Sequence, residues 1–239
     1  MSGTIYLGSS GWAYSSWKPD FYPQKLSSKK FLGYYAQRVN SVEVNYTFRA
    51  LPSASMTQAW LAATGSDFRF SFKAPQRITH ILRLDGYQES LAAFFRSLQP
   101  FLDAKRMGIV LFQLPPNFPA HPERLASFLA EAAATELRLA FEFRHRSWFT
   151  EEVYAILGKH QTALCVAESD DLSTPDEKTA PFSCYRFRKS SYPAQELARI
   201  RNLIKMRVAE GDLFGYFKHE ETPEGVLHAA TLLQELRPA

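Results

Sequence analysis

Apolar positions in this chain recur either at every second residue or in short continuous runs rich in β-branched and aromatic side chains, a pattern typical of strands. Segments with helical spacing lie between most of these runs. Regular alternation of strand and helix favours a parallel sheet, and eight such units predict a closed (β/α)₈ TIM-type barrel. The predicted strands are Thr4–Gly8, Ser41–Phe48, Phe68–Lys73, Gly108–Leu114, Arg138–Arg144, Thr162–Glu168, Phe182–Arg188 and Leu213–Lys218.

The helical pattern is present in seven segments. One crossover departs from the scheme: Ser169–Pro181 is polar and contains proline, so we expect a loop or a single turn there. We also expect the third predicted helix to be interrupted at Pro100. The predicted helices are Lys29–Val39, Ser53–Ala63 with Ser53 as its N-cap, Tyr87–Lys105, His121–Ala133, Glu151–Lys159, Ala194–Glu210 and Pro223–Leu236.

Composition adds limits to this picture. With 239 residues, 46% hydrophobic and 22% charged, the chain suits one globular domain spanning residues 1–239. It has no apolar run long enough for a membrane span and no recognisable export signal. The two cysteines, Cys165 and Cys184, are too few for a disulfide framework. We therefore predict a cytoplasmic protein.

The chemistry is concentrated where strands end. The stretch AFEFRHRSWF (Ala140–Phe149) alternates Phe141 and Phe143 with Glu142 and Arg144. The other predicted strands likewise carry polar residues on one parity near their ends. In a TIM-type barrel the active site lies at this C-terminal end, so we expect Glu43, Lys73, Glu142 and Arg186 to converge at the barrel mouth.

Structural explanations remain open for the same residues. Buried salt bridges inside a barrel could simply neutralise one another as a core network. A histidine at a strand end, such as His80 or His145, is often only a hydrogen-bonded scaffold residue. Trp12, Trp17 and Trp148 could stack on a ligand, although core packing is the favoured interpretation.

Five motifs stand out along the chain: GSSGWAYSSWKPDFYP (Gly8–Pro23), VEVNYTF (Val42–Phe48), FSFKAPQRITH (Phe70–His80), GIVLFQLPPNF (Gly108–Phe118) and FEFRHRSW (Phe141–Trp148). Together they resemble the motifs of the YecE-like proteins, also called domain of unknown function 72. The resemblance covers nearly the whole chain. It implies a TIM-type barrel and leaves the activity open. The characteristic polar positions of the family fall here on Trp12, Glu43, Asn45, Lys73, Thr79, His80, Gln113, Glu142, Arg144, His145, Trp148 and Arg186.

The late part of the chain departs from the family pattern. Glu168 stands where the family usually has Asp. Arg188 and Lys189 replace His and Gly in the pattern at the end of the seventh strand, and Lys218-His219 replaces Asn-Asn at the end of the eighth. The added cations favour a more anionic ligand, or a loss of the ancestral activity.

The leading hypothesis is an enzyme that uses acid/base catalysis on a small anionic or polyhydroxylated substrate bearing phosphate or carboxylate, with its reaction class open between hydrolase, lyase and isomerase. No cofactor is predicted. The candidate catalytic residues are Glu142, Glu43, His80 and Lys73. The candidate substrate-binding residues are Trp12, Asn45, Gln113, Arg144, His145, Trp148, Arg186, Arg188 and Lys218.

Two alternatives remain. A divalent metal could be held by Glu43, Glu142, Glu168, His80 and His145, as in isomerase-like or endonuclease-like barrels, although the nearby cations oppose it. Alternatively, the chain could be a nucleic-acid-binding or other non-catalytic module that uses the basic segment Phe182–Val208, which contains Arg186, Arg188, Lys189, Arg199, Arg201, Lys205 and Arg207.

Overall fold

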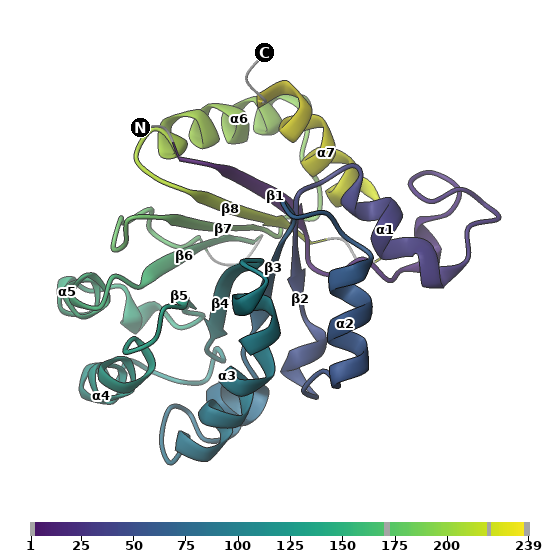
Figure 1. Cartoon of the computed structure of the whole chain (residues 1–239). Coiled ribbons are helices and arrows are strands. Elements are labelled where there is room, and N and C mark those ends of the chain that lie inside the picture. Colours follow the sequence, from purple (N-terminus) through teal and green to yellow (C-terminus); the bar gives the residue numbers. More distant parts are fainter. Residues whose placement is uncertain (1–2, 170–172, 219–220, 237–239) are drawn as a thin grey trace.

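The computed structural model describes residues 3–169, 173–218 and 221–236. Eight parallel strands form one sheet in the order β1-β8-β7-β6-β5-β4-β3-β2, and helices surround it (Figure 1). This is the (β/α)₈ TIM-type barrel that the sequence predicted. The strands are β1 (Ile5–Ser9), β2 (Ser41–Val44), β3 (Arg69–Lys73), β4 (Met107–Gln113), β5 (Arg138–Glu142), β6 (Ala163–Glu168), β7 (Ser183–Phe187) and β8 (Leu213–Phe217).

Seven α-helices form the outer layer in the described residues. Ser53 caps α2 as expected, because its hydroxyl accepts a hydrogen bond from the Met56 amide. The helices are α1 (Phe31–Ala36), α2 (Ala54–Ala62), α3 (Gln88–Asp103), α4 (Pro122–Ala132), α5 (Glu151–Lys159), α6 (Ala194–Val208) and α7 (Glu224–Leu236). None of the helices described is long and apolar enough to cross a membrane.

Two local expectations had different outcomes. The described part of the sixth crossover, residues 169 and 173–181, contains no helix, as the polar sequence predicted. The predicted break at Pro100 is wrong, because α3 continues through it to Asp103. Leu98 and Phe101 are fully buried on either side of the proline, so core packing holds the last turn of the helix in place.

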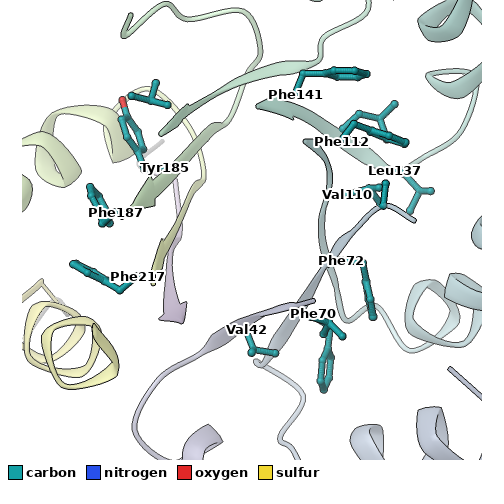
Figure 2. Packing of buried hydrophobic residues seen from close by; sticks show 14 of the residues in the cluster. Val42, Phe70, Phe72, Val110, Phe112, Leu137, Phe141, Tyr185, Phe187 and Phe217 are labelled. Atoms are coloured by element: carbon teal, nitrogen blue, oxygen red, sulfur yellow. The ribbon is translucent and has the colours of Figure 1, made fainter. Parts of the chain in front are cut away.

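The strands separate two kinds of surface. Their outward-facing side chains, including Phe72, Phe112, Phe141 and Phe187, point toward the helices and form the main hydrophobic core (Figure 2). The inward-facing side chains form a separate, smaller apolar cluster. Cys165 and Cys184 belong to that inner cluster as free, buried thiols on paired positions of β6 and β7.

A buried hydroxyl chain crosses the barrel interior. Tyr216 on β8 contacts Ser71 Oγ at 2.6 Å and Ser41 Oγ at 2.7 Å, on β3 and β2. Ser41 donates its proton to the Arg69 carbonyl, and Ser71 Oγ accepts from the Ile109 amide. It follows that Ser71 donates to Tyr216 and Tyr216 donates to Ser41. One phenol thus links three strands across the barrel.

Replacing Tyr216 with Phe is expected to lower the free energy of unfolding by about 1–3 kcal/mol, because two buried serine hydroxyls lose a partner. Urea unfolding followed by circular dichroism measures this. Tyr46→Phe serves as the control, since Tyr46 is 46% exposed. Equal stability of the two variants would show that the hydroxyl chain contributes nothing.

The barrel is closed at β1 and β2 largely by side chains. The Asn40 amide accepts from the Leu7 N–H at 2.9 Å and donates to the Ile5 carbonyl at 2.7 Å. Tyr35 Oη, on α1, accepts from the Ser9 N–H at 2.8 Å and donates to the Ser41 carbonyl at 3.0 Å. We call this contact between β1 and β2 the seam.

Candidate active site

Two buried glutamates share one arginine at the C-terminal end of the barrel. Arg186 on β7 donates from Nη2 to Glu43 Oε1 at 2.7 Å and from Nη1 to Glu142 Oε2. The arginine is 2% exposed, and the glutamates, on β2 and β5, are 1% and 0% exposed. The register of the strands explains why these three side chains meet. Residues that pair across parallel strands face the same side of the sheet. Glu43 pairs with Ser71, Glu142 with Gln113, and Arg186 with Tyr216, and all of them face the barrel interior.

Further donors hold both carboxylates. Ser10 Oγ donates to Glu43 Oε1 at 2.7 Å. Glu142 Oε1 accepts from Gln113 Nε2 at 2.7 Å and from Arg144 Nε at 2.8 Å. Arg144 is 31% exposed and folds back onto the strand that precedes it. Glu142 therefore has three donors on its two oxygens, and Arg144 forms the solvent-facing edge of the site.

Electrostatics fixes the charge state of Glu142. Burial raises the pKa of this carboxyl, but the guanidinium groups of Arg186, Arg144 and Arg188 outweigh it and hold the pKa well below its usual range. A carboxylate that remains ionised and fully hydrogen-bonded is a poor proton carrier near neutral pH. The predicted general acid or base role of Glu142 thus lacks support, and a positioning role fits the geometry better.

Lys73 differs from the other charged residues of the site. Its ammonium lies 4.1 Å from the centroid of the Phe48 ring. Within the described residues, no carboxylate oxygen lies at ion-pairing distance from it. Burial lowers the pKa of Lys73 to about 8, with Arg186 and Arg188 acting in the same direction and Glu43 and Glu142 opposing it. Lys73 therefore loses its proton closer to neutral pH than an ordinary lysine does.

His80 lies beside Lys73 on a π-helical turn, Arg77–Ile81, that follows β3. Its ring contacts Phe48 at 5.0 Å between centroids, and its Nδ1 hydrogen-bonds the Thr79 hydroxyl at 2.8 Å. Burial, followed by the nearby Lys73, lowers the pKa of His80. The imidazole is thereby favoured in its neutral form at the site.

We define the mouth cluster as Glu43, Lys73, Glu142, Arg144, Arg186 and Arg188. Arg188 follows β7, is partly buried, and has no carboxylate within ion-pairing distance among the described residues. Burial and the neighbouring Arg186 lower its pKa, yet a guanidinium stays charged at neutral pH. The mouth cluster therefore carries more cationic side chains than acidic ones.

Other predicted ligand-binding residues lie around the mouth cluster without joining its hydrogen bonds. Asn45 and Lys218 directly follow β2 and β8 and are partly buried. Trp12 is partly buried against Trp60, with ring centroids 5.3 Å apart. The His145 Nδ1 contacts the Ser147 hydroxyl at 2.8 Å, in the loop after β5. His219 lies outside the described residues.

Three of the residues considered for the site lie away from the mouth. Glu168 pairs in register with Phe187, faces the helices and accepts a hydrogen bond from Arg199 on α6, so it cannot act as a metal ligand at the mouth. Trp148 is fully buried and stacks on Phe143 at 4.6 Å, which confirms the favoured interpretation of core packing and removes it from the candidate substrate-binding residues.

The third is Lys189, which turns away from the mouth to pair with Glu196 on α6 at 2.9 Å.

The other candidate metal ligands do not come together in the fold. Across residues 3–169, 173–218 and 221–236, no group of three or more His, Cys, Asp or Glu side chains is arranged to hold a metal ion.

The basic segment is largely neutralised by the fold. Among its seven cations, five contact carboxylates, and only Arg188 and Lys205 have no acidic partner among the described residues. The five paired cations are Arg186, Lys189, Arg199, Arg201 and Arg207. Such a surface offers little free positive charge to a phosphate backbone.

Comparison with known proteins identifies the family. Residues 6–239 match the family described as protein of unknown function DUF72. The chain belongs to the DUF72 family. This DUF72 chain is 34% identical over 155 residues to the UPF0759 protein YunF of Bacillus subtilis, and 32% identical over 164 residues to the UPF0759 protein YecE of Escherichia coli K12.

The alignments cover 63% and 67% of this DUF72 chain, but only 54% and 57% of the two relatives. The chain thus matches about half the length of these curated relatives. Solved structures agree on the fold. A DUF72 family protein from Thermotoga maritima superposes with a TM-score of 0.85 at 25% identity, covering 98% of this chain and 99% of that one.

A second DUF72 structure, from Enterococcus faecalis, gives a TM-score of 0.77 at 20% identity and covers 98% and 97% of the two chains. At this identity the likeness concerns the fold alone. The family assignment and the barrel are therefore secure, while the chemistry rests on the site itself.

Two contributors to the site were not among the residues predicted from the sequence. Ser10 follows β1, and its position relative to Gly8 puts it on the inward parity, which could have identified it. Phe48 lies in the short helix Tyr46–Phe48 after β2, where the predicted strand was too long by four residues. No strand periodicity could have placed its ring under Lys73.

Proposed function

We propose that this chain is an enzyme that binds a small anionic, hydroxylated substrate at the barrel mouth and acts on it by proton transfer. The observation that carries the proposal is the surplus of positive charge in the mouth cluster. Glu43 and Glu142 are already held by Arg186, Ser10, Gln113 and Arg144. Lys73 and Arg188 are thus left without an acidic partner among the described residues.

An anion is the ligand that such an arrangement favours. A guanidinium binds phosphate or carboxylate with two parallel hydrogen bonds, and Arg188 and the partly exposed Arg144 could both supply them. In TIM-type barrels, phosphate sites commonly use the loops after the seventh and eighth strands, and Arg188 follows the seventh.

A purely structural ion network explains the site less well. Glu43 Oε2 and Arg186 Nε are both buried and have no hydrogen-bond partner in the described part of the chain. An unpaired buried polar atom costs about 1–3 kcal/mol, and a molecule bound at the mouth would supply the missing partners.

Proton transfer is assigned to Lys73 and His80 in place of Glu142. The pKa of Lys73 is about 8, and that of His80 is lowered by burial and the nearby cations. Lys73 can therefore exchange a proton near neutral pH, and the neutral His80 imidazole can accept one, as general acid/base catalysis requires. In this proposal Arg144 and Arg188 hold the anion, and Glu142 orients Arg144.

Arg188→Ala is expected to weaken the binding of phosphate or a sugar phosphate about tenfold or more, because a charge-assisted contact contributes about 1.5–3 kcal/mol. Isothermal titration calorimetry at low salt measures the change. A neutral sugar should bind more weakly than either anion to the unmodified protein.

Lys205→Ala is the matched control, since Lys205 is an exposed cation on α6 without an acidic partner among the described residues. It should leave anion affinity unchanged. Equal, weak binding of phosphate by the unmodified protein and by Arg188→Ala would contradict the proposal and show that Arg188 is only a solvated cation at the rim.

A further inference from the structure

Lys73 is placed as a nucleophile and not as an ion-pair partner. It is the last residue of β3, and its neighbour two positions back, Ser71, faces the barrel interior. Its ammonium rests on the ring of Phe48 at 4.1 Å. The two nearby carboxylates are held by other donors, so no described residue holds Lys73 in its charged form through an ion pair.

The neighbourhood favours a free amine. The Phe48 ring removes solvent from one side of the Lys73 side chain while its face attracts the charged form, and the positive charges of Arg186 and Arg188 oppose protonation. Among the described groups that act on it, Glu43 and Glu142 favour the charged form, and each has a smaller influence than burial. A lysine beside other cations in a partly desolvated site is a recognised arrangement for amine nucleophiles.

We propose that Lys73 Nζ forms an imine with the carbonyl group of a small anionic compound, an oxo acid or a phosphorylated aldehyde or ketone. This inference rests on the proposed function, because Arg144 and Arg188 would hold the anionic group while the carbonyl carbon meets Lys73. It names the substrate class that the proposed function leaves open.

The reaction balances without any further reagent. The nitrogen lone pair attacks the carbonyl carbon, a C–N bond forms, and the C=O π electrons move to oxygen. The C–O bond of the resulting carbinolamine then breaks, and the oxygen leaves as water with the two protons of the original amine. The product is a C=N bond, and nothing is oxidised or reduced.

Reductive trapping tests the proposal. The protein is incubated with cyanoborohydride and one of four probes: pyruvate, glyoxylate, dihydroxyacetone phosphate or neutral acetone. Peptide mapping by mass spectrometry then quantifies the reduced adduct on each lysine. We expect at least one anionic probe to label Lys73 about tenfold or more faster than Lys205, with a smaller preference for acetone, which shares the reactive amine but not the anion contact. Comparing the oxo acids with the phosphorylated ketone distinguishes a carboxylate from a phosphate as the recognised group.

Two variants make the test specific. Lys73→Arg should lose the preferred adduct while keeping its thermal unfolding transition. Arg188→Ala retains Lys73 but removes a cation that opposes its protonation, so it should reduce labelling by the anionic probes by a larger factor than labelling by acetone. Labelling of Lys73 at the rate of Lys205 by every probe would overturn the imine.

Phosphate titration of the same samples separates the two proposals. If the unmodified protein binds phosphate through Arg188 but Lys73 shows no preferred adduct, the imine fails and the anion site stands. If phosphate does not bind and Lys73 is not labelled preferentially, both proposals fail.

Discussion

Arg186→Met is expected to lower the free energy of unfolding by about 3–5 kcal/mol, because it leaves two buried carboxylates without their shared counter-charge. Arg186 and both glutamates are at most 2% exposed, so water cannot replace the lost guanidinium without opening the barrel mouth. Urea unfolding at pH 7 measures the loss of unfolding free energy. A variant that is already unfolded without urea corresponds to the largest loss expected.

The control is Arg201→Met, which breaks the Arg201–Glu235 pair at the surface. Its side chains are 39% and 43% exposed, and such pairs contribute at most about 1 kcal/mol. A triple variant, Arg186→Met with Glu43→Gln and Glu142→Gln, should recover part of the stability because no buried charge is left unpaired. Similar losses in Arg186→Met and Arg201→Met would show that the buried ion network is not strongly coupled.

The second large effect is a loss of stability in acid that depends on Glu142. The folded-state pKa of this carboxyl lies below its unfolded value of about 4.3. Its contribution is therefore fully present above about pH 4.3 and declines as pH falls toward the folded-state pKa. A strongly paired carboxylate contributes on the order of 2–3 kcal/mol in this way.

Glu142→Gln is expected to be less stable than the unmodified protein at pH 7, with a difference that shrinks as pH is lowered below about 4. Chemical unfolding at a series of pH values measures both curves. Glu196→Gln is the control, since Glu196 is paired with Lys189 and Arg199 near the surface. Parallel curves for Glu142→Gln and the unmodified protein would mean that Glu142 does not titrate differently on folding.

Most of the fold could be predicted because strand periodicity and helix caps are local signals. All eight strands lie within or close to their predicted ranges. The inward positions of Glu43, Glu142 and Arg186 followed from alternation against bulky apolar neighbours. Glu168 was misplaced because this signal is missing from its strand. β6 is apolar on both faces, so its sequence carries no alternation that distinguishes inward-facing from outward-facing positions.

The finer features of the site depend on contacts between distant segments. Arg144 lies beyond the end of β5 and returns to Glu142, a side-chain conformation that no periodicity specifies. The isolation of Lys73 depends on Arg186 occupying both glutamates, and the sequence left it open which cation would do so. The periodicity of the sequence predicted which residues meet at the mouth. Packing of the folded barrel determines their hydrogen-bond partners and their protonation states.

The seam between β1 and β2 has a consequence for the order in which the barrel assembles. Two of the hydrogen bonds that join these strands belong to Tyr35, a residue of α1, and not to the strands themselves. The first and second strands therefore acquire their full set of partners only once α1 has docked. Closure of the cylinder and docking of its first helix therefore share hydrogen bonds, and each stabilises the other.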